Sequence, residues 1–329
     1  MTALDDLDRG LLHALHLDAR APFTEIADVL GTSTQTVTRR YQRLVRDAGL
    51  RVTGLPDAAG TRQQQWIVRL TATPGPAHDI AHALARRADT AWVRLTSGGT
   101  EIVAIVRSEP GAGNSLLLRD VPRTSSVTSV SAHYMLHTYL GGPTAWRGHV
   151  DALSLAQQQE LARPTGSGEP VDLGDADRAL LAALAQDGRV GYAALAAVTG
   201  WSASTVARRI EHLRTRGALF FDVEVDDSRL GVTASALLWM SVPPAQLDVV
   251  AAELAGHAEL AVVAATTGRT NLLANALCAD TEALHRYLTT RLALPAITHL
   301  ETTPILRTLK AVAPAGAASV RAGRGRPAR

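Results

Sequence analysis

Apolar residues near the start of the chain recur every three or four positions, the spacing of one face of an amphipathic helix. The stretch "LDDLDRGLLHAL" has this pattern, and Asp5 is placed to cap the helix. A shorter apolar cluster, "FTEIADVLG", suits about two helical turns that end at Gly31. After Ser33, a natural N-cap, "TQTVTRRYQRLVRD" again has apolar residues at helical spacing. The pattern predicts three helices, of which the second is short and the last two are joined by a tight glycine turn.

The same pattern occurs a second time in the chain. Asp6–Leu50 aligned without a gap on Asp175–Leu219 matches at roughly 19 of 45 positions, far above chance. The third segment of the second copy, "SASTVARRIEHLRT", again follows a glycine and begins at a serine, Ser202. The chain therefore contains an internal duplication of a three-helix domain.

Behind each copy, apolar stretches typical of strands alternate with helical ones. The first set is "QQQWIVRLTA", "GPAHDIAHALARRA", "TAWVRLTSGGTEIVAIVRS", "GNSLLLRDVP" and "SSVTSVSAHYMLHTYL". The second set is "ALLWMSV", "PAQLDVVAAELAGH", "AELAVVAATTGRTNLLANALC", "DTEALHRYLTTRL" and "AITHLETTPILRTL". Each set has the order β-α-β-β-α-β of a ferredoxin-like sandwich, an antiparallel sheet with two helices on one face. The predicted fold class is α+β, with two winged-type helix-turn-helix domains and two ferredoxin-like domains in tandem.

These patterns, and the Pro-, Gly- and Ser-rich stretch "ARPTGSGEPVDLG", predict the domain boundaries. We expect helix-turn-helix domains at 1–55 and 173–225, ferredoxin-like domains at 62–150 and 232–312, a linker at 162–172, and a disordered basic tail at 313–329.

The exposed face of each third helix carries arginine and short polar side chains. Guanidinium groups suit phosphate oxygens and the guanine edge, and hydroxyl and amide groups at the start of the helix can reach bases or phosphates. A solvated face of a structural helix bundle is the alternative, but the recurrence of the same caps and arginines in both copies favours DNA binding. The candidate DNA-binding residues are Ser33, Thr34, Gln35, Thr36, Arg39, Arg40 and Arg43 in the first copy, and Ser202, Ser204, Thr205, Arg208 and Arg209 in the second.

Composition narrows the class of protein. The chain has 329 residues, a net charge of +2 and a sequence pI near 9.0. It has no apolar run of membrane-span length and no signal peptide pattern, so a cytoplasmic protein is expected. The single cysteine, Cys278, excludes an internal disulfide and predicts a buried apolar role. No phosphate-binding loop, metal-spaced His/Cys cluster or nucleophile elbow occurs, so neither a cofactor nor a metal is expected.

The stretch "LDDLDRGLLHALHLDARAPFTEIADVLGTSTQTVTRRYQRLVRDAGL" resembles the N-terminal domain of the leucine-responsive regulator/AsnC (Lrp/AsnC) family of transcription factors. The resemblance covers two complete units in tandem. It implies a homo-oligomeric DNA-binding regulator that senses an amino acid or related metabolite through its ferredoxin-like domains. The turns "SGGTE" and "TGRTN" fall where the family has a glycine and acidic residues, although the acids are only partly present, and simple turns are the alternative. The candidate effector-binding residues are Gly98, Thr100, Thr267, Gly268, Arg269 and Asn271.

The tandem arrangement leads to the hypothesis that the two halves form an internal pseudo-dimer. Its recognition helices differ in sequence, so the preferred DNA site is expected to be an imperfect palindrome with half-sites about one helical turn apart. The basic tail contains Arg324-Gly325-Arg326-Pro327, a pattern that suits a narrow A·T minor groove, with general phosphate attraction as the alternative.

Two other classes of function remain open. Tetrapyrrole decarboxylases resemble two units of the same family, and His133, His137 and Arg147 would then be candidates for a proton donor and a carboxylate anchor. The helix faces with their arginines would have no role in such an enzyme. A metabolite-binding module without DNA binding is the third reading, and a duplex-affinity measurement separates it from a regulator.

Overall fold

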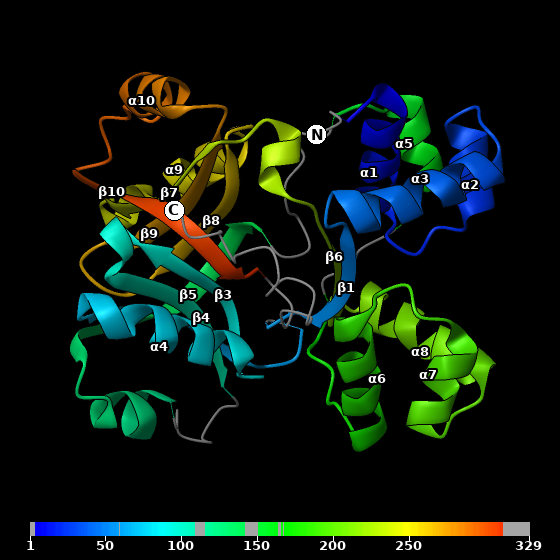
Figure 1. The fold of residues 1–329 in the computed structure, drawn as a ribbon, viewed down its shortest axis with the longest axis horizontal. Coiled ribbons are helices and arrows are strands. Elements are labelled where there is room, and N and C mark those ends of the chain that lie inside the picture. Colours follow the sequence, from blue (N-terminus) through cyan, green and yellow to red (C-terminus); the bar gives the residue numbers. More distant parts are fainter. Residues whose placement is uncertain are drawn as a thin grey trace, which may run out of the picture. The chain divides into compact units, whose positions relative to one another are not determined.

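The computed structural model describes residues 4–58, 60–108, 116–141, 151–163, 166 and 168–311. The chain divides into two compact units, one formed by residues 1–62 and 135–304 and the other by residues 63–134 and 305–329 (Figure 1). Arg147 and the basic tail with Arg324–Pro327 lie outside the described residues. The described part has no helix long and apolar enough to cross a membrane.

The first three-helix domain forms as the sequence predicts. Asp5 caps the first helix, and its carboxylate accepts the backbone N–H of Asp8 while the Asp8 carboxylate accepts that of Asp5. Gly31 has a φ of 62°, which a glycine adopts without strain, and Ser33 caps the third helix. The helices are α1 (Asp6–Leu17), α2 (Phe23–Val29) and α3 (Thr34–Asp47).

The second copy forms the same three helices. Gly200 ends the middle helix at a φ of 73°, and the hydroxyl of Ser202 caps the third. Leu180, Leu184 and Val206, all fully buried, belong to a separate apolar core in this domain. Its helices are α6 (Asp175–Gln186), α7 (Tyr192–Thr199) and α8 (Ala203–Thr215).

One further helix, α5 (Leu155–Leu161), packs on the first domain and was not predicted. Ser154 caps it, and the amide of Gln157 donates to the carbonyl of Val29 at the end of α2. Leu161 is fully buried in the core of the first domain. Only seven residues long, α5 depends on this packing rather than on its own propensity, so the periodic pattern gave no clear signal.

A two-stranded antiparallel sheet joins the two helix-turn-helix domains, and Figure 1 shows its strands side by side. The strand that follows each third helix, β1 (Arg51–Pro56) or β6 (Leu219–Glu224), pairs with the equivalent strand of the other copy. The register is centred on Thr53 and Asp222, which occupy corresponding positions in the two copies. Gly54 permits a close approach here, because a Cβ at that position would lie 2.9 Å from the Cβ of Leu184.

The second ferredoxin-like domain lies in the same unit and has the predicted order of elements. Its neighbouring strands are β8 (Leu260–Thr266), β9 (Leu272–Cys278), β7 (Ala234–Ser241) and β10 (His299–Lys310), all antiparallel. Residues 135–140 of β5 (Val127–Leu140) extend the sheet beside β8. Cys278 is 3% exposed in the apolar core of this domain, as expected, and burial raises the pKa of its thiol to about 11. The elements are β7 (Ala234–Ser241), α9 (Leu247–Ala255), β8 (Leu260–Thr266), β9 (Leu272–Cys278), α10 (Thr281–Thr289) and β10 (His299–Lys310).

The other unit contains the first ferredoxin-like sheet. Its strands lie in the order β3 (Thr90–Thr96), β4 (Glu101–Ser108), β2 (Gln64–Ala72) and β5. Residues 305–310 of β10 pair with β3. In place of the second predicted helix, the described residues form a single π-helical turn at Leu116–Asp120 and a 3-10 turn at Val121–Arg123. Pro122 is compatible with the start of such a turn but removes a backbone donor. The elements are β2 (Gln64–Ala72), α4 (Pro74–Arg86), β3 (Thr90–Thr96), β4 (Glu101–Ser108) and β5 (Val127–Leu140).

Candidate nucleic-acid interface

The start of α3 presents short polar side chains on a capped helix end. The hydroxyl of Ser33 accepts the backbone N–H of Thr36 at 3.1 Å and lies 2.9 Å from the Thr36 hydroxyl. Thr34 and Gln35, which lie between Ser33 and Thr36 in the chain, are exposed. The Ser33 and Thr36 hydroxyls therefore hold the helix start in place, while Thr34 and Gln35 are open to a ligand.

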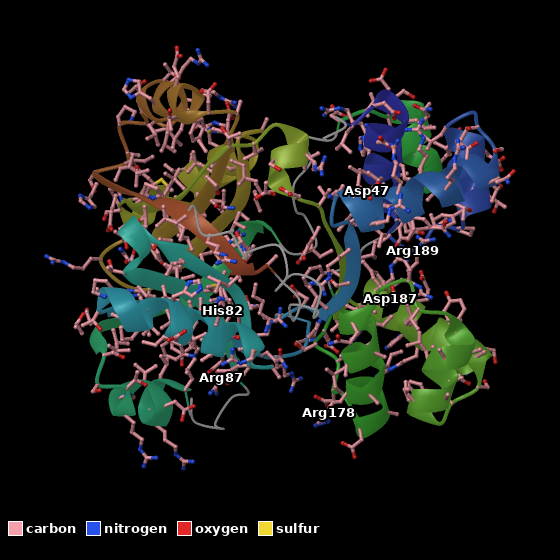
Figure 2. All side chains as sticks on the ribbon, in the orientation of Figure 1. Asp47, His82, Arg87, Arg178, Asp187 and Arg189 are labelled. Carbon is pink, nitrogen blue, oxygen red and sulfur yellow. The ribbon has the colours of Figure 1, made fainter. Side chains whose placement is uncertain are left out.

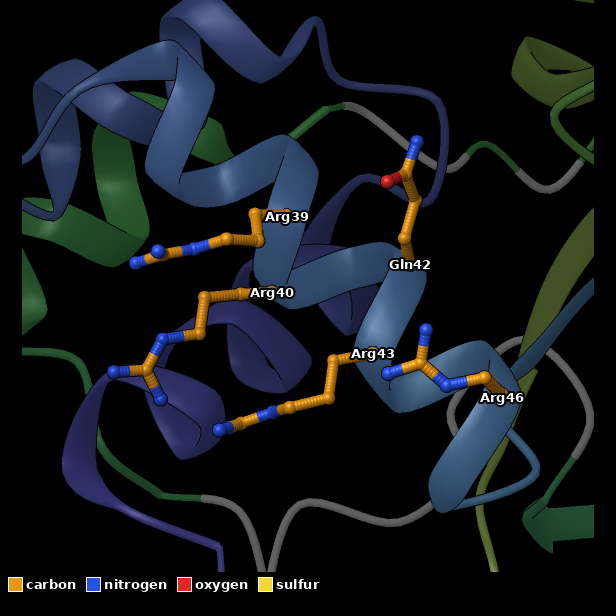
Figure 3. Close-up of a pocket in the computed structure, with 5 residues that line it drawn as sticks. All are labelled: Arg39, Arg40, Gln42, Arg43 and Arg46. Atoms are coloured by element: carbon orange, nitrogen blue, oxygen red, sulfur yellow. The ribbon is translucent and has the colours of Figure 1, made fainter.

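The arginines of α3 are of two kinds, and Figure 3 shows them along one stretch of the helix. Arg39 is exposed. Arg40 and Arg43 instead extend toward the start of α1, where Arg40 forms ion pairs with Asp5 and Asp8 and Arg43 forms one with Asp8. The hydrogen bond to Asp5 raises the pKa of Arg40. The Asp8 side chain is only 1% exposed, so these guanidinium groups neutralise a buried carboxylate as well as facing outward.

The start of α8 repeats this arrangement with the corresponding residues of the second copy. The hydroxyl of Ser202 accepts the backbone N–H of Thr205 at 3.1 Å and lies 2.9 Å from the Ser204 hydroxyl. The guanidinium of Arg209 donates two hydrogen bonds, of 2.7 and 2.8 Å, to the carboxylate of Asp177 on α6. Arg208 is exposed, like Arg39 at the corresponding position of the first copy. Each recognition helix therefore has two consecutive arginines, of which the first, Arg39 or Arg208, is exposed and the second, Arg40 or Arg209, is ion-paired.

Sequence reasoning along one helix missed these acidic partners. The carboxylates come from the first helix of each domain, more than thirty residues earlier in the chain. The repeat carried a usable signal, because "LDDLDR" and "LGDADR" both retain an aspartate at the position of Asp8 or Asp177, and the partner arginine is retained too. A residue pair kept in both copies indicates a contact that both copies need.

The second half of the recognition helix differs between the copies. On α3, a pocket is lined by Arg39, Arg40, Gln42, Arg43 and Arg46 (Figure 3). The corresponding stretch of α8 has Glu211, His212 and Thr215, all exposed, where α3 has Gln42, Arg43 and Arg46. The helix α3 is therefore more cationic than α8, which favours phosphate contacts by α3.

Two arginines at corresponding positions hold the two domains together. Arg20 donates to the carbonyls of Gly188 and Val190 at 2.5 and 3.0 Å, and Arg189 donates to the carbonyls of Ala19 and Ala21. Each residue therefore binds the loop that contains the other, as in an isologous dimer interface. Figure 2 marks Arg189 and Asp187 in this loop.

The same two guanidinium groups also stack on aromatic rings of the opposite domain. Arg20 lies 4.8 Å from the ring centroid of Tyr192, and Arg189 lies 4.5 Å from that of Phe23, which corresponds to Tyr192. Burial lowers the pKa of Arg189. The interface thus combines a shared sheet with a reciprocal pair of arginines, and both features obey the same local two-fold symmetry.

The candidate effector residues lie in two turns, one in each unit. In the 63–134 unit, Gly98 has a φ of 72° and the hydroxyl of Thr100 donates to the carbonyl of Ser97, as in an ordinary tight turn. In the other unit, the amide of Asn271 donates to the carbonyl of Val242 and accepts its N–H. Thr267 is half-buried, whereas Gly268 and Arg269 are exposed. Asn271 therefore ties this turn to the end of β7.

The two histidines considered for an enzyme lie on β5, in different units. The ring of His133 is 2.5 Å from the Ser131 hydroxyl, and the ring of His137 packs edge-on against Tyr139. Among the described residues no group of three His, Cys, Asp or Glu side chains is arranged to hold a metal ion.

The fold defines a protein with two helix-turn-helix domains, paired through β1 and β6, and two antiparallel sheets that carry helices. The model of the AsnC-type helix-turn-helix domain matches residues 4–45 and again 173–214, and that of the Lrp/AsnC ligand binding domain matches residues 235–314. The chain therefore belongs to the Lrp/AsnC family of transcriptional regulators, with its helix-turn-helix domain present twice.

Individual relatives agree with this assignment. The HTH-type transcriptional regulator FL11 of Pyrococcus horikoshii is 27% identical over 141 residues, which cover 43% of this chain and 93% of the relative. FL11 of Pyrococcus furiosus is 28% identical over 117 residues, covering 35% and 78%. Among solved structures, the siroheme decarboxylase NirDL has a TM-score of 0.62 at 14% identity and covers 94% of this chain and 93% of its own. That last likeness shows a common fold.

Proposed function

We propose that this chain is a sequence-specific DNA-binding regulator whose two recognition helices, α3 and α8, belong to one internal pseudo-dimer. The observation that carries the proposal is the symmetric pairing of the two helix-turn-helix domains through β1, β6, Arg20 and Arg189. In a helix-turn-helix dimer, such pairing presents two recognition helices to successive major grooves about one helical turn apart. Here one chain supplies both helices.

Direct reading of bases is assigned to the exposed side chains at the front of each helix. Thr34, Gln35 and Arg39 have this role on α3, and Ser204 and Arg208 have it on α8. Arginine suits the O6/N7 edge of guanine, and glutamine suits adenine. Because Gln35 corresponds to Ser204, the two half-sites should differ, and the operator is an imperfect palindrome.

The ion-paired arginines have a supporting role in this proposal. Arg40, Arg43 and Arg209 hold the recognition helix against the first helix of its own domain. They also keep the carboxylates of Asp8 and Asp177 neutralised close to where DNA phosphates would lie. The helix caps also contribute to DNA binding, because N–H groups in the first turn of a helix suit a phosphate. The residues of these caps are Ser33, Thr36, Ser202 and Thr205.

The second ferredoxin-like domain is proposed to bind a small effector, an amino acid or a related metabolite, and to support homo-oligomer formation. The support is the match of residues 235–314 to the Lrp/AsnC ligand binding domain. Thr267, Gly268 and Arg269 are the candidate contacts in this domain, while Asn271 holds the turn. Gly98 and Thr100 are the corresponding candidates in the first ferredoxin-like domain.

Selection from a random duplex pool at fixed, near-physiological salt tests the proposal. The native chain should enrich an asymmetric motif. The double variant Arg39→Ala/Arg208→Ala should bind that motif about 10- to 100-fold more weakly and lose base preference at the positions that the two arginines read. The double variant Arg62→Ala/Arg286→Ala removes the same charge from exposed positions outside the recognition helices and serves as the control. A perfectly symmetric motif, or equal losses in both double variants, would contradict the proposal.

A decarboxylase function is the alternative class, because the fold likeness to NirDL extends over nearly the whole chain. We infer that this chain is not such an enzyme, since its sequence relatives are transcriptional regulators. The exposed arginines of α3 and α8 would also have no role in a decarboxylase. Failure of the native chain to enrich any duplex, together with an absorbance change on adding an iron tetrapyrrole, would reverse this inference.

A further inference from the structure

The short segments that leave the β1–β6 sheet cross over to the opposite recognition helix. After β1, the backbone N–H of Asp57 donates to the carbonyl of Ala218, just past α8, at 3.1 Å. After β6, the N–H of Asp226 donates to the carbonyl of Ala48, just past α3, also at 3.1 Å. Each connector therefore contacts the end of the recognition helix that belongs to the other copy.

The second connector, residues 226–232, holds α3 with a side chain as well. The guanidinium of Arg229 donates to the carbonyl of Asp47, the last residue of α3, with an Nη2–O distance of 2.7 Å. The last carbonyls of a helix have no partner within the helix and carry the negative end of its dipole. A cation donating to one of them is therefore favourable and fixes where the helix ends.

This connector is itself rigid. The carboxylate of Asp226 accepts the N–H and the hydroxyl of Ser228, and Gly231 closes the turn at a φ of 80°. Leu230 and Val232 are buried in the core of the first helix-turn-helix domain. Arg229 is thus presented to α3 from a short turn that is fixed on both sides.

The first connector has no equivalent side chain. The position that corresponds to Arg229 is Gly60, and a Cβ there would lie 2.2 Å from the carbonyl oxygen of Gly217. The backbone of this connector therefore lies directly against the end of α8, and no side chain fits between them. The two recognition helices are held at their C-terminal ends in different ways.

We propose that Arg229 is a positioning residue for DNA reading: from the second half of the chain, it sets the position of α3, the recognition helix of the first half. The inference rests on the proposed function of α3 as a DNA-reading helix. A small displacement of a recognition helix moves its base-reading side chains out of hydrogen-bonding reach, so discrimination between bases falls before overall phosphate affinity does.

The test uses the full-length chain and the duplex motif enriched by selection. Arg39→Ala and Arg208→Ala first assign each half-site to α3 or α8, by the positions at which base preference is lost. Single-base changes in each half-site are then measured with the native chain, Arg229→Ala, Arg229→Lys and Arg62→Ala. Arg62 is an exposed arginine of the first connector and is the matched control.

Arg229→Ala should lower discrimination about five- to tenfold in the half-site assigned to α3 and less than twofold in the other, consistent with loss of one charge-assisted hydrogen bond. Arg229→Lys, which restores a charged donor, should recover part of the loss, and Arg62→Ala should change neither half-site. If Arg229→Ala does not fold, Arg229→Gln should give the same one-sided loss at smaller size. If Arg229→Ala lowers discrimination equally in both half-sites, or in neither, the role of Arg229 is overturned while the proposed function stands. If no duplex is enriched, the role of Arg229 and the proposed function are both overturned.

Discussion

At the scale of single residues, the arginines show how far sequence reasoning reaches. Arg39 and Arg208 could be picked from the sequence as exposed cations, because the helical period places them away from the apolar stripe. The ion pairs of Arg40 and Arg209 could not be read from one helix, since their aspartates come from a different helix. Arg20 and Arg189 were missed as well, although "DAR" and "DGR" recur at corresponding positions in the two copies.

Asp222 gives a pH-dependent prediction at this scale. Burial between the strands, together with the nearby charge of Glu224, raises the pKa of its carboxyl to about 7 from an ordinary 3.8. Between these values the folded chain holds a proton that the unfolded chain has released, so this group's contribution to stability is present at low pH and is lost as pH rises toward 7. The gain in free energy of unfolding from Asp222→Asn, measured against the native chain, should therefore be roughly 1–2 kcal/mol larger at pH 8 than at pH 4.

Urea unfolding of the native chain and Asp222→Asn at several pH values measures this difference. Asp226→Asn changes a carboxylate of the connector just beyond the shared sheet and should not produce the same trend. A gain from Asp222→Asn that is identical at pH 4 and pH 8 would rule out the raised pKa.

At the scale of elements, helix caps and glycine turns made the six helix-turn-helix helices predictable. Each third helix combines a serine cap, a preceding glycine of positive φ and an apolar stripe, so several local signals agree. The sequence of α5 has no such set of agreeing local signals, since this helix is stabilised by its tertiary contacts. In the described part of the second helix expected for the first ferredoxin-like domain, residues 116–123 form two short turns, and Pro122 removes a backbone donor there.

The serine caps can be tested directly. Ser33→Ala and Ser202→Ala each remove the hydroxyl that accepts a first-turn N–H at 3.1 Å, so each should lower the free energy of unfolding by about 1 kcal/mol. Thr34→Ala, an exposed change one residue away, is the control and should alter it by less than about 0.5 kcal/mol. Equal effects of Ser33→Ala and Thr34→Ala in urea unfolding would show that the cap contributes nothing.

At the scale of the whole molecule, the tandem repeat predicted the pairing of two helix-turn-helix domains but not how they pair. The duplication and the β-α-β-β-α-β order are properties of the sequence itself. The symmetric register of β1 on β6 depends on which residues of two distant segments meet, and no local pattern specifies that. The close approach of Gly54 to α6 likewise became visible only in the folded chain.

The reciprocal arginines predict how strongly the two halves hold together. Arg20→Ala and Arg189→Ala each remove two hydrogen bonds and a cation–π contact across the interface, so each should lower the free energy of unfolding by roughly 1–3 kcal/mol. Arg286→Ala, on the exposed side of α10, should have little effect. If either interface variant unfolds in urea like the Arg286→Ala control, these contacts do not stabilise the pairing.

The centre of the β1–β6 sheet has a meaning for the history of the chain. In a dimer of identical subunits, a residue on the two-fold axis meets its own copy, so an aspartate there would face an aspartate. Here Thr53 faces Asp222, a combination that no pair of identical subunits could contain. Fusion into one chain released this position from self-complementarity, and every other pair across the axis gained the same freedom to diverge.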